Sequence, residues 1–317
     1  MTLIMLSLGS AVVYGAADFF GGAASRRASA RSVLLVSLPI GLVVLIVAAL
    51  ATGHTLSAHD SMWALVAGLA GGGGLIVFYD ALARGPMSVV APVAALVSAL
   101  LPVAAGLAGG ERPTPSVLIG VAICLAAICL VSLEEPRAAA TDAAATDAAA
   151  TDAAGPAASD RRRRPRSVRG PLMAALSGVG FGVFFILLRE AGRHDWAWAL
   201  VVSRAAGLAV VIAVVLGGWA LTRASRRSAA GVPARLIPTD PAALLIAVLT
   251  GILDSLANTL YVFASRAGML SLAAVLTSMY PAITVLLARV VYSERLRMVQ
   301  RLGVALALAG VALVTAG

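Results

Sequence analysis

Long apolar stretches separated by short polar ones dominate this sequence. Ten stretches each contain about 20 mostly apolar residues, the length at which an α-helix crosses the hydrocarbon core of a bilayer. They cover roughly residues 3–23, 32–52, 62–83, 87–108, 115–133, 171–188, 195–221, 241–264, 269–291 and 299–316. In lipid only helices and closed barrels satisfy every backbone hydrogen bond, and barrel strands alternate apolar with polar residues. The pattern therefore predicts an all-α integral membrane protein with ten transmembrane helices.

Composition agrees with a membrane protein. The chain is 60% hydrophobic and 12% charged, whereas soluble domains carry about 25% charged residues. The net charge of +9 comes from arginines in short loops between apolar runs. Such loops favour contact with the phosphates of anionic lipids over nucleic acid. The expected partners are therefore the lipid bilayer and a small-molecule substrate, with no nucleic acid.

The middle of the chain differs from the rest. Residues 134–170 contain Thr-Asp-Ala-Ala-Ala units that begin at Thr141 and Thr146, followed by a cluster of arginines. This composition buries too little apolar surface to hold a fold. We expect a flexible linker between a first repeat at residues 1–133 and a second at 171–317. Contact of its arginines with anionic lipid and a plain role in fixing topology explain the cluster equally well.

The two halves resemble each other. Residues Ser88–Val131 align at a constant shift with Ser271–Val314, which places Glu111 on Glu294 and a glycine at the same distance after each. Two halves of five helices each must have opposite orientations in the membrane. The sequence therefore predicts two inverted five-helix repeats, an arrangement common among transporters.

Particular motifs carry a resemblance to a known family. The run Tyr79-Asp-Ala-Leu-Ala-Arg-Gly and the later Gly110-Glu-Arg-Pro are similar to half of an EamA-type transporter of the drug/metabolite transporter (DMT) superfamily. The second half repeats the pattern with Tyr280-Pro281 and Ser293-Glu-Arg-Leu. The match covers nearly the whole chain apart from the linker. It implies transmembrane transport by inverted repeats, with efflux as one direction.

The chain departs from the family pattern in two places. Its linker is longer than the usual short connection. The position that matches Pro281 is Ser98 in the first half. A kink at that position is therefore expected to be absent there, or shifted to Pro92 or Pro102.

Arginines in the loops bear on orientation. Positive residues in short loops mark the cytoplasmic side. The odd-numbered loops hold most arginines, whereas the even-numbered loops hold only Arg112, Arg189, Arg193 and Arg266. This bias predicts a multi-pass protein of the cell (plasma or inner) membrane with a cytoplasmic linker and both termini outside. The family resemblance favours cytoplasmic termini.

Few ionisable groups lie inside the apolar stretches, and such groups usually face a cavity or a partner. Asp254 is central because Asp254, Asn258, Tyr261 and Ser265 fall close to one helical face. One reading is a cavity wall that binds substrate or carries a proton. The other is hydrogen bonding between helices.

Further candidates for substrate or ion binding lie on other helices. Arg204 resembles a basic residue that EamA-type proteins often carry in this helix, where it can pair with Asp254 or Asp18 or bind a substrate carboxylate. Asp18 is a candidate for proton coupling or for an interfacial position. Tyr14, Tyr79 and Tyr280 can line a cavity or serve as packing residues.

Glu111 and Glu294 occupy equivalent turns at helix ends. The family resemblance suggests a structural or gating role for them, and helix capping is the simpler account.

Together these features predict a secondary transporter that exports small metabolites, amino acids or amphipathic compounds by alternating access, with proton coupling an open question. A non-transporting membrane scaffold or sensor is the alternative. The sequence lacks HExxH and GxSxG patterns and metal-ligand spacing, so we expect no catalytic residues, no metal and no cofactor. One chain contains both halves of a cavity, so a monomer suffices and a dimer stays open.

Overall fold

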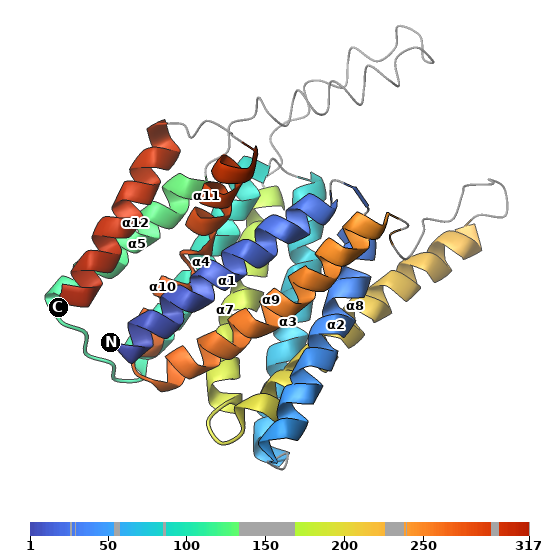
Figure 1. Ribbon diagram of the computed structural model, residues 1–317, viewed down its shortest axis with the longest axis horizontal. Coiled ribbons are helices and arrows are strands. Elements are labelled where there is room, and N and C mark those ends of the chain that lie inside the picture. Colours follow the sequence, from blue (N-terminus) through green and yellow to red (C-terminus); the bar gives the residue numbers. More distant parts are fainter. Residues whose placement is uncertain are drawn as a thin grey trace, which may run out of the picture.

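The computed structural model is a bundle of helices (Figure 1). It describes residues 1–25, 27–28, 30–53, 58–84, 87–132, 169–225, 238, 240–292 and 298–316, and no strand occurs among them. The helices are α1 (Thr2–Ser25), α2 (Ala30–Thr52), α3 (Ala58–Arg84), α4 (Met87–Ala108), α5 (Pro115–Ser132), α7 (Arg169–Ala191), α8 (Trp196–Ser225), α9 (Pro241–Arg266), α10 (Leu270–Thr277), α11 (Tyr280–Tyr292) and α12 (Met298–Ala316). Each predicted span is thereby confirmed as helical. The two ends of the chain lie at the same end of the bundle (Figure 1), which we call the terminal end.

The ninth span is broken into α10 and α11. The break falls just before Pro281, which has no N–H to donate to the carbonyl of Thr277. The Thr284 hydroxyl lies within hydrogen-bonding distance of the Tyr280 and Gly15 carbonyls, at 3.1 Å from each, and so fastens α11 to α1. The equivalent helix α4 has Ser98 at this position and continues unbroken. A break near Pro281 is therefore present in the second repeat, whereas α4 of the first repeat continues as one helix past Ser98.

The helix contacts follow a twofold relation between the repeats. Helix α3 packs extensively on α7, and its counterpart α9 packs in the same way on α1. Likewise α3 contacts α8, and α9 contacts α2, while α5 and α12 pack on each other. Exchanging the two repeats converts the α3–α7 interface into the α9–α1 interface and the α3–α8 interface into the α9–α2 interface. The same exchange maps the α5–α12 interface onto itself. The fold is thus the predicted pair of inverted five-helix repeats.

Glycines set the distance between the two repeats. A Cβ on Gly68 of α3 would lie 2.1 Å from the carbonyl oxygen of Ser203, and a Cβ on Gly251 of α9 would lie 2.2 Å from that of Ser37. The two contacts are related by the exchange of repeats. Small residues allow such close helix packing in lipid, where the hydrophobic effect does not hold helices together.

Glu111 joins the repeats at the terminal end. It follows α4, yet its carboxylate accepts hydrogen bonds from the backbone N–H groups of Leu270 and Ser271 and from the Ser271 hydroxyl, the last at 2.6 Å. These groups form the first turn of α10, whose N-cap residue Met269 supplies no side-chain hydrogen bond. Glu111 of the first repeat therefore caps a helix of the second, and the expected capping role is confirmed for α10.

Arg189 completes this junction. Its guanidinium lies 3.2 Å from the Glu111 carboxylate and donates to the Gly268 carbonyl at 3.4 Å. Burial alone would raise the pKa of Glu111, but the hydrogen bonds from Ser271, Leu270 and Arg189 together lower it below its ordinary value. Gly106 leaves room for the carboxylate, since a Cβ there would lie 2.3 Å from Oε2. We call Glu111, Arg189 and the first turn of α10 the Glu111 junction. Glu294 lies outside the described residues.

The glycine contacts generate a first prediction. The Gly68→Ala variant should be less stable by about 1–3 kcal/mol, because its methyl group meets backbone that cannot move without separating α3 from α8. Gly73→Ala in the same helix is the matched control, since a Cβ there meets nothing within 4 Å. The measurement is the thermal unfolding midpoint of each purified variant in detergent. Equal midpoints for the two variants would contradict the proposed close contact.

A second prediction concerns the pH dependence of the Glu111 junction. Because the folded-state pKa lies below the unfolded value of about 4.3, Glu111 stabilises the fold above that pH and loses this contribution as pH falls through the lowered pKa. Glu111→Gln should therefore unfold at a lower temperature than wild type at neutral pH, and the difference should shrink below about pH 4.

The control for this experiment is Glu190→Gln, which removes an exposed pair with Arg193. Such pairs contribute little to stability, so this variant should follow the wild type at every pH. A Glu111→Gln difference that stayed constant down to pH 3 would contradict the assigned role of the carboxylate charge.

Candidate functional site

An ion pair joins α8 and α9. Arg204 of α8 donates through Nη2 to the Asp254 carboxylate of α9 and lies 3.4 Å from the Ser255 hydroxyl. Of the two partners predicted for Arg204, the structure therefore selects Asp254. In a low-dielectric medium each charge would be costly alone, and pairing compensates part of that desolvation.

Close packing of α2 positions the pair. A Cβ on Gly41 would lie 2.6 Å from the Ser255 hydroxyl and 3.5 Å from Nε of Arg204. The Ser255 hydroxyl itself donates to the Gly251 carbonyl at 3.0 Å. Glycine at position 41 thus lets α2 cover one side of the guanidinium.

Asp254 faces the interior of the bundle and not the lipid. The exposed apolar row of α9 comprises Leu245, Leu249, Ile252 and Leu256. With 100° per residue, Asp254 projects from the opposite side of the helix. Its side chain is nevertheless 31% exposed, against 14% for Arg204. The carboxylate is therefore only partly covered by neighbouring side chains.

Asn258 extends the cluster by one helical turn. Its amide nitrogen donates to the Asp254 backbone carbonyl at 2.8 Å and to the Asp254 carboxylate at 3.3 Å. Both partners are acceptors, so they fix the orientation of the amide. The other amide atom, Oδ1, is buried without a hydrogen-bond partner among the described residues. The site therefore contains an acceptor that the protein leaves unused.

Helix α1 contributes the facing side of the cluster. Tyr14 lies within electrostatic range of Asp254 and Arg204, and Asp18 lies within range of Asp254. Among the residues that the structure describes, Asp18 forms no ion pair and no hydrogen bond. Asp18 is thus a carboxylate within a membrane-spanning helix without a counter-ion among the described residues.

Aromatic rings surround the polar groups. The Tyr14 ring centroid lies 6.0 Å from that of Tyr280 and 6.3 Å from that of Phe185. The Tyr261 ring packs at a tilt against Phe185, with ring centroids 4.6 Å apart, and its hydroxyl donates to the Phe185 carbonyl at 3.0 Å. Tyr261 is fully buried, so it packs behind the cluster, whereas Tyr14 and Tyr280 are only partly buried.

The burial of the interior face of α1 changes along the length of the helix. Ser7 and Gly15 are buried, but Asp18 and Gly22, which lie close to the same face, are exposed. A Cβ on Gly22 would meet nothing within 4 Å, whereas one on Gly15 would lie 2.7 Å from the Tyr280 carbonyl oxygen. The interior face of α1 is therefore tightly packed toward the terminal end and loosely packed toward the end where α1 finishes.

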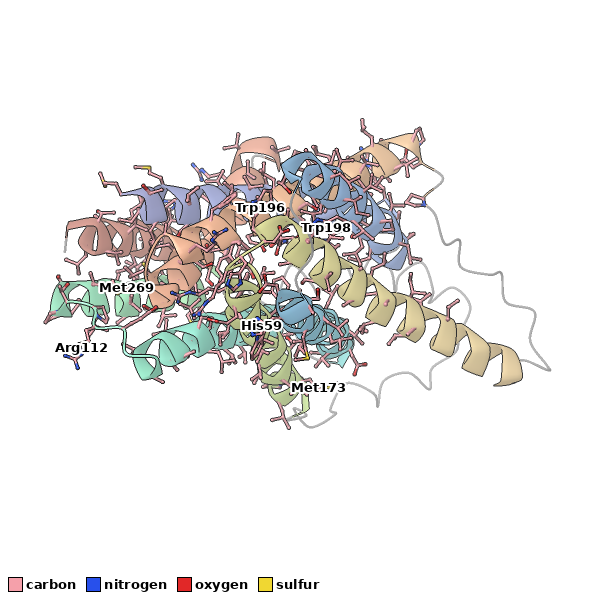
Figure 2. All side chains as sticks on the ribbon, turned by 90° about the horizontal axis from the view of Figure 1, so that it is seen from below. His59, Arg112, Met173, Trp196, Trp198 and Met269 are labelled. Atoms are coloured by element: carbon pink, nitrogen blue, oxygen red, sulfur yellow. The ribbon has the colours of Figure 1, made fainter. Side chains whose placement is uncertain are left out.

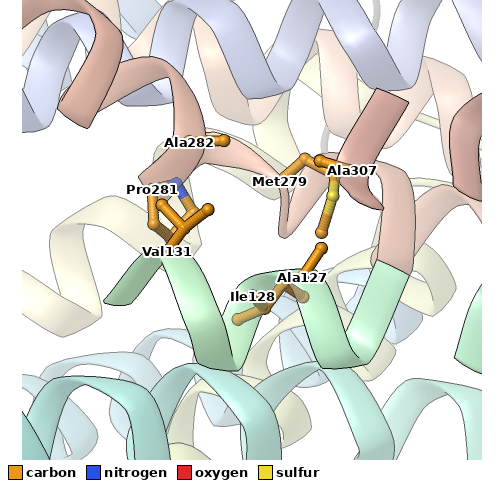
Figure 3. Close-up of a pocket in the computed structure, with 7 residues that line it drawn as sticks. All are labelled: Ala127, Ile128, Val131, Met279, Pro281, Ala282 and Ala307. Carbon is orange, nitrogen blue, oxygen red and sulfur yellow. The ribbon is translucent and has the colours of Figure 1, made fainter. Parts of the chain in front are cut away.

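Two other regions do not join this site. The pocket in Figure 3 lies between α5, α11 and α12, has an entirely apolar lining and leaves no room for a water molecule. We place the candidate site at the Arg204–Asp254 cluster because that is where charges and hydroxyls converge. Tyr79 belongs to α3, but its side chain lies outside the described part of the chain.

A second polar group lies at the terminal end. Asp60 is buried, and Nδ1 of His194 lies 3.1 Å from its carboxylate. His59 lies beside it in the first turn of α3 (Figure 2). Within the described ranges, His, Cys, Asp and Glu form no group of three that can hold a metal ion. Sequence reasoning missed this contact because Asp60 and His194 are far apart in the chain.

Comparisons with known proteins agree with this architecture. Among curated proteins, no relative matches the chain. A solved structure titled "Crystal structure of protein" matches with a TM-score of 0.70 and 19% identity, over 99% of this chain and 96% of that one. At this identity the likeness shows the fold alone. The profile of the EamA-like transporter family matches residues 1–133 and 168–316. The chain therefore belongs to the EamA-like transporter family and is a membrane transporter of the drug/metabolite type.

Proposed function

We propose that this protein is a secondary transporter that moves a small molecule by alternating access through the Arg204–Asp254 cluster. The observation that carries the proposal is an ion pair within membrane-spanning helices whose carboxylate, that of Asp254, stays 31% exposed on the side of α9 opposite its exposed apolar row. Charged groups in such a place usually mark a substrate or ion pathway.

Both repeats contribute to the cluster, which suits alternating access. Tyr14 and Asp18 come from α1 of the first repeat, whereas Arg204, Asp254 and Tyr280 come from helices of the second. A rocking movement of one repeat against the other would change the distances between these groups and expose the site to opposite sides in turn.

In this scheme the Glu111 junction keeps the terminal end closed. It links the repeats through hydrogen bonds to the first turn of α10 and through the ion pair with Arg189. Opening of the terminal end requires these bonds to break. The junction therefore sets the balance between the two states of the transporter.

We infer the direction from the distribution of loop arginines. The arginine-rich loops place the linker in the cytoplasm and both termini outside. The loosely packed end of α1 then faces the cytoplasm, which suits a plasma or inner membrane exporter that loads its substrate there. Asp18 is the proposed proton carrier, because it is a carboxylate of a membrane-spanning helix that forms no ion pair with the described residues. A single chain is the proposed transporting unit.

The test is transport by the purified full-length chain in proteoliposomes, with a panel of amines, amino acids and neutral amphipathic compounds. At least one class should move in response to a pH gradient. Asp254→Asn and Asp18→Asn should each lower the rate by at least about tenfold, since each removes an interior charge. Glu190→Gln, at an exposed pair, is the matched control and should transport normally.

The outcomes separate the alternatives. If the Asp18→Asn and Asp254→Asn variants still accumulate substrate against its gradient, coupling through these carboxylates is wrong. Binding without movement of any panel compound would instead support the non-transporting scaffold or sensor.

A further prediction concerns access to the site. In a background with Cys124 and Cys129 replaced by serine, Gly22→Cys should react with a membrane-impermeant thiol reagent from the linker side only. Ser7→Cys should react slowly from either side, because Ser7 is buried near the terminal end. Adding Glu111→Gln to Ser7→Cys should raise the reaction rate of the thiol from the terminal side severalfold. This increase corresponds to a change of about 1 kcal/mol in the free-energy difference between the two states of the transporter. An unchanged rate would contradict the role of the junction in closing that end.

A further inference from the structure

Two histidines contact a buried carboxylate near the start of α3. The Asp60 side chain is 1% exposed, and its Oδ1 lies 3.1 Å from Nδ1 of His194 and 3.5 Å from Nδ1 of His59. Its other oxygen, Oδ2, is buried without a hydrogen-bond partner among the described residues. The side chains of His194 and His59 are 74% and 68% exposed. Asp60 is thus shielded from solvent, whereas the two groups that can balance its charge are in contact with it.

The contact between Asp60 and His194 joins the two repeats. Asp60 lies in the first turn of α3 in the first repeat, and His194 lies in the turn between α7 and α8 of the second. Helix α4, which also contacts α3, contains no titratable residue. The charged groups at this end of α7 and α8 have other partners: Arg189 pairs with Glu111, Arg193 pairs with Glu190, and Asp195 accepts the N–H groups of Ala197 and Trp198. Among the described residues, the titratable groups that face Asp60 are therefore the two histidines.

The two histidines differ at their second ring nitrogen. Nε1 of Trp63 lies 3.1 Å from Nε2 of His59. The indole N–H only donates, so Nε2 of His59 accepts, and the proton of the neutral ring lies on Nδ1, which faces Asp60. A second proton on His59 would have to displace Trp63. Nε2 of His194 has no hydrogen bond to the described residues, so His194 can take up a proton from solvent without breaking a contact.

The opposite end of the bundle has a corresponding contact with a permanent charge. Arg27, between α1 and α2, lies 3.5 Å from the carboxylate of Asp240, the N-cap residue of α9. Exchange of the repeats relates α9 to α3, and the shift that places Tyr14 on Phe181 also places Arg27 on His194. A guanidinium stays charged in proteins, whereas histidine changes its charge between about pH 5 and 8. Of these two corresponding contacts, only the one at the terminal end has a charge that varies with pH.

We propose that His194 and Asp60 form a pH-sensitive tether between the repeats at the terminal end, which becomes stronger when the solution at that face is acidic. Hydrogen bonds between ionised partners are stronger than those between neutral ones. Protonated His194 loses its counter-charge if α3 separates from the α7–α8 turn, so protonation favours the joined state. This stabilisation is present near about pH 5.5 and is lost as the pH rises through the range in which histidine titrates. The protein thereby senses pH at one of its two faces.

Hydrogen–deuterium exchange of the purified full-length protein in detergent tests the tether. No substrate is needed, so the outcome does not depend on the proposed transport function. Exchange of the backbone amides at the start of α3 and in the α7–α8 turn is compared at about pH 5.5 and about pH 8.5, with rates corrected for the intrinsic effect of pH. In the wild type the corrected exchange should be about twofold to fivefold slower at the acidic pH, the range expected for an exposed ion pair.

Three variants identify the group responsible. His194→Gln keeps a hydrogen-bond donor but cannot be protonated, so the difference between the two pH values should disappear. His59→Gln should retain the difference. Arg27→Gln should speed exchange between α1 and α2 by the same factor at both pH values, because its pair is always charged.

The thermal unfolding midpoint gives a second measure. The His194→Gln midpoint should lie below that of the wild type at the acidic pH and equal it at the alkaline pH. The proposal is overturned if His194→Gln retains the wild-type difference in exchange, or if His59→Gln loses it. Equal corrected exchange of the wild type at the two pH values would also overturn it.

Discussion

The absence of water from the hydrocarbon core is the constraint on which this structure depends. Every polar group at that depth needs a partner from the protein or access to an interior space. Helix formation satisfies the backbone, and glycine contacts such as Gly68 against Ser203 and Gly251 against Ser37 bring the helices close enough to exclude lipid. Arg204 and Asp254 then satisfy each other as an ion pair between α8 and α9.

This constraint explains why the sequence predicted the fold well. Apolar length alone located the membrane helices, because a span in lipid has few alternatives. The repeat relation was visible because Glu111 and Glu294 lie at equivalent positions, and the structure confirms the relation in reciprocal contacts. Gly120 packs against Val314, and Gly303 against Val131. These four positions correspond at the same shift that aligns the halves.

The partners within the site were harder to predict. Helical spacing placed Asp254, Asn258 and Tyr261 on one face, but spacing within one helix does not reveal what faces it. The structure uses Tyr261 in packing against Phe185, while Asp254 pairs with Arg204 on another helix. Glu111 shows the same limit, because its capping role was foreseeable but its partner, the start of α10, is 159 residues away in sequence. Contacts between distant segments follow from the packing of repeats, which local pattern does not encode.

The Glu111 junction and the Arg204–Asp254 pair have different consequences for movement of one repeat against the other. The Glu111 junction offers several donors to one carboxylate, and hydrogen bonds to charged groups contribute about 1.5–3 kcal/mol each. A state that breaks the junction must therefore form comparable contacts elsewhere, or it would remain too rare to support transport. The Arg204–Asp254 pair joins two helices of the same repeat, so it can persist through a movement between repeats. Asp18 belongs to the other repeat and has no described protein partner. Its interaction energy is thus the one in the cluster most free to change with the position of α1 and with an occupant of the site.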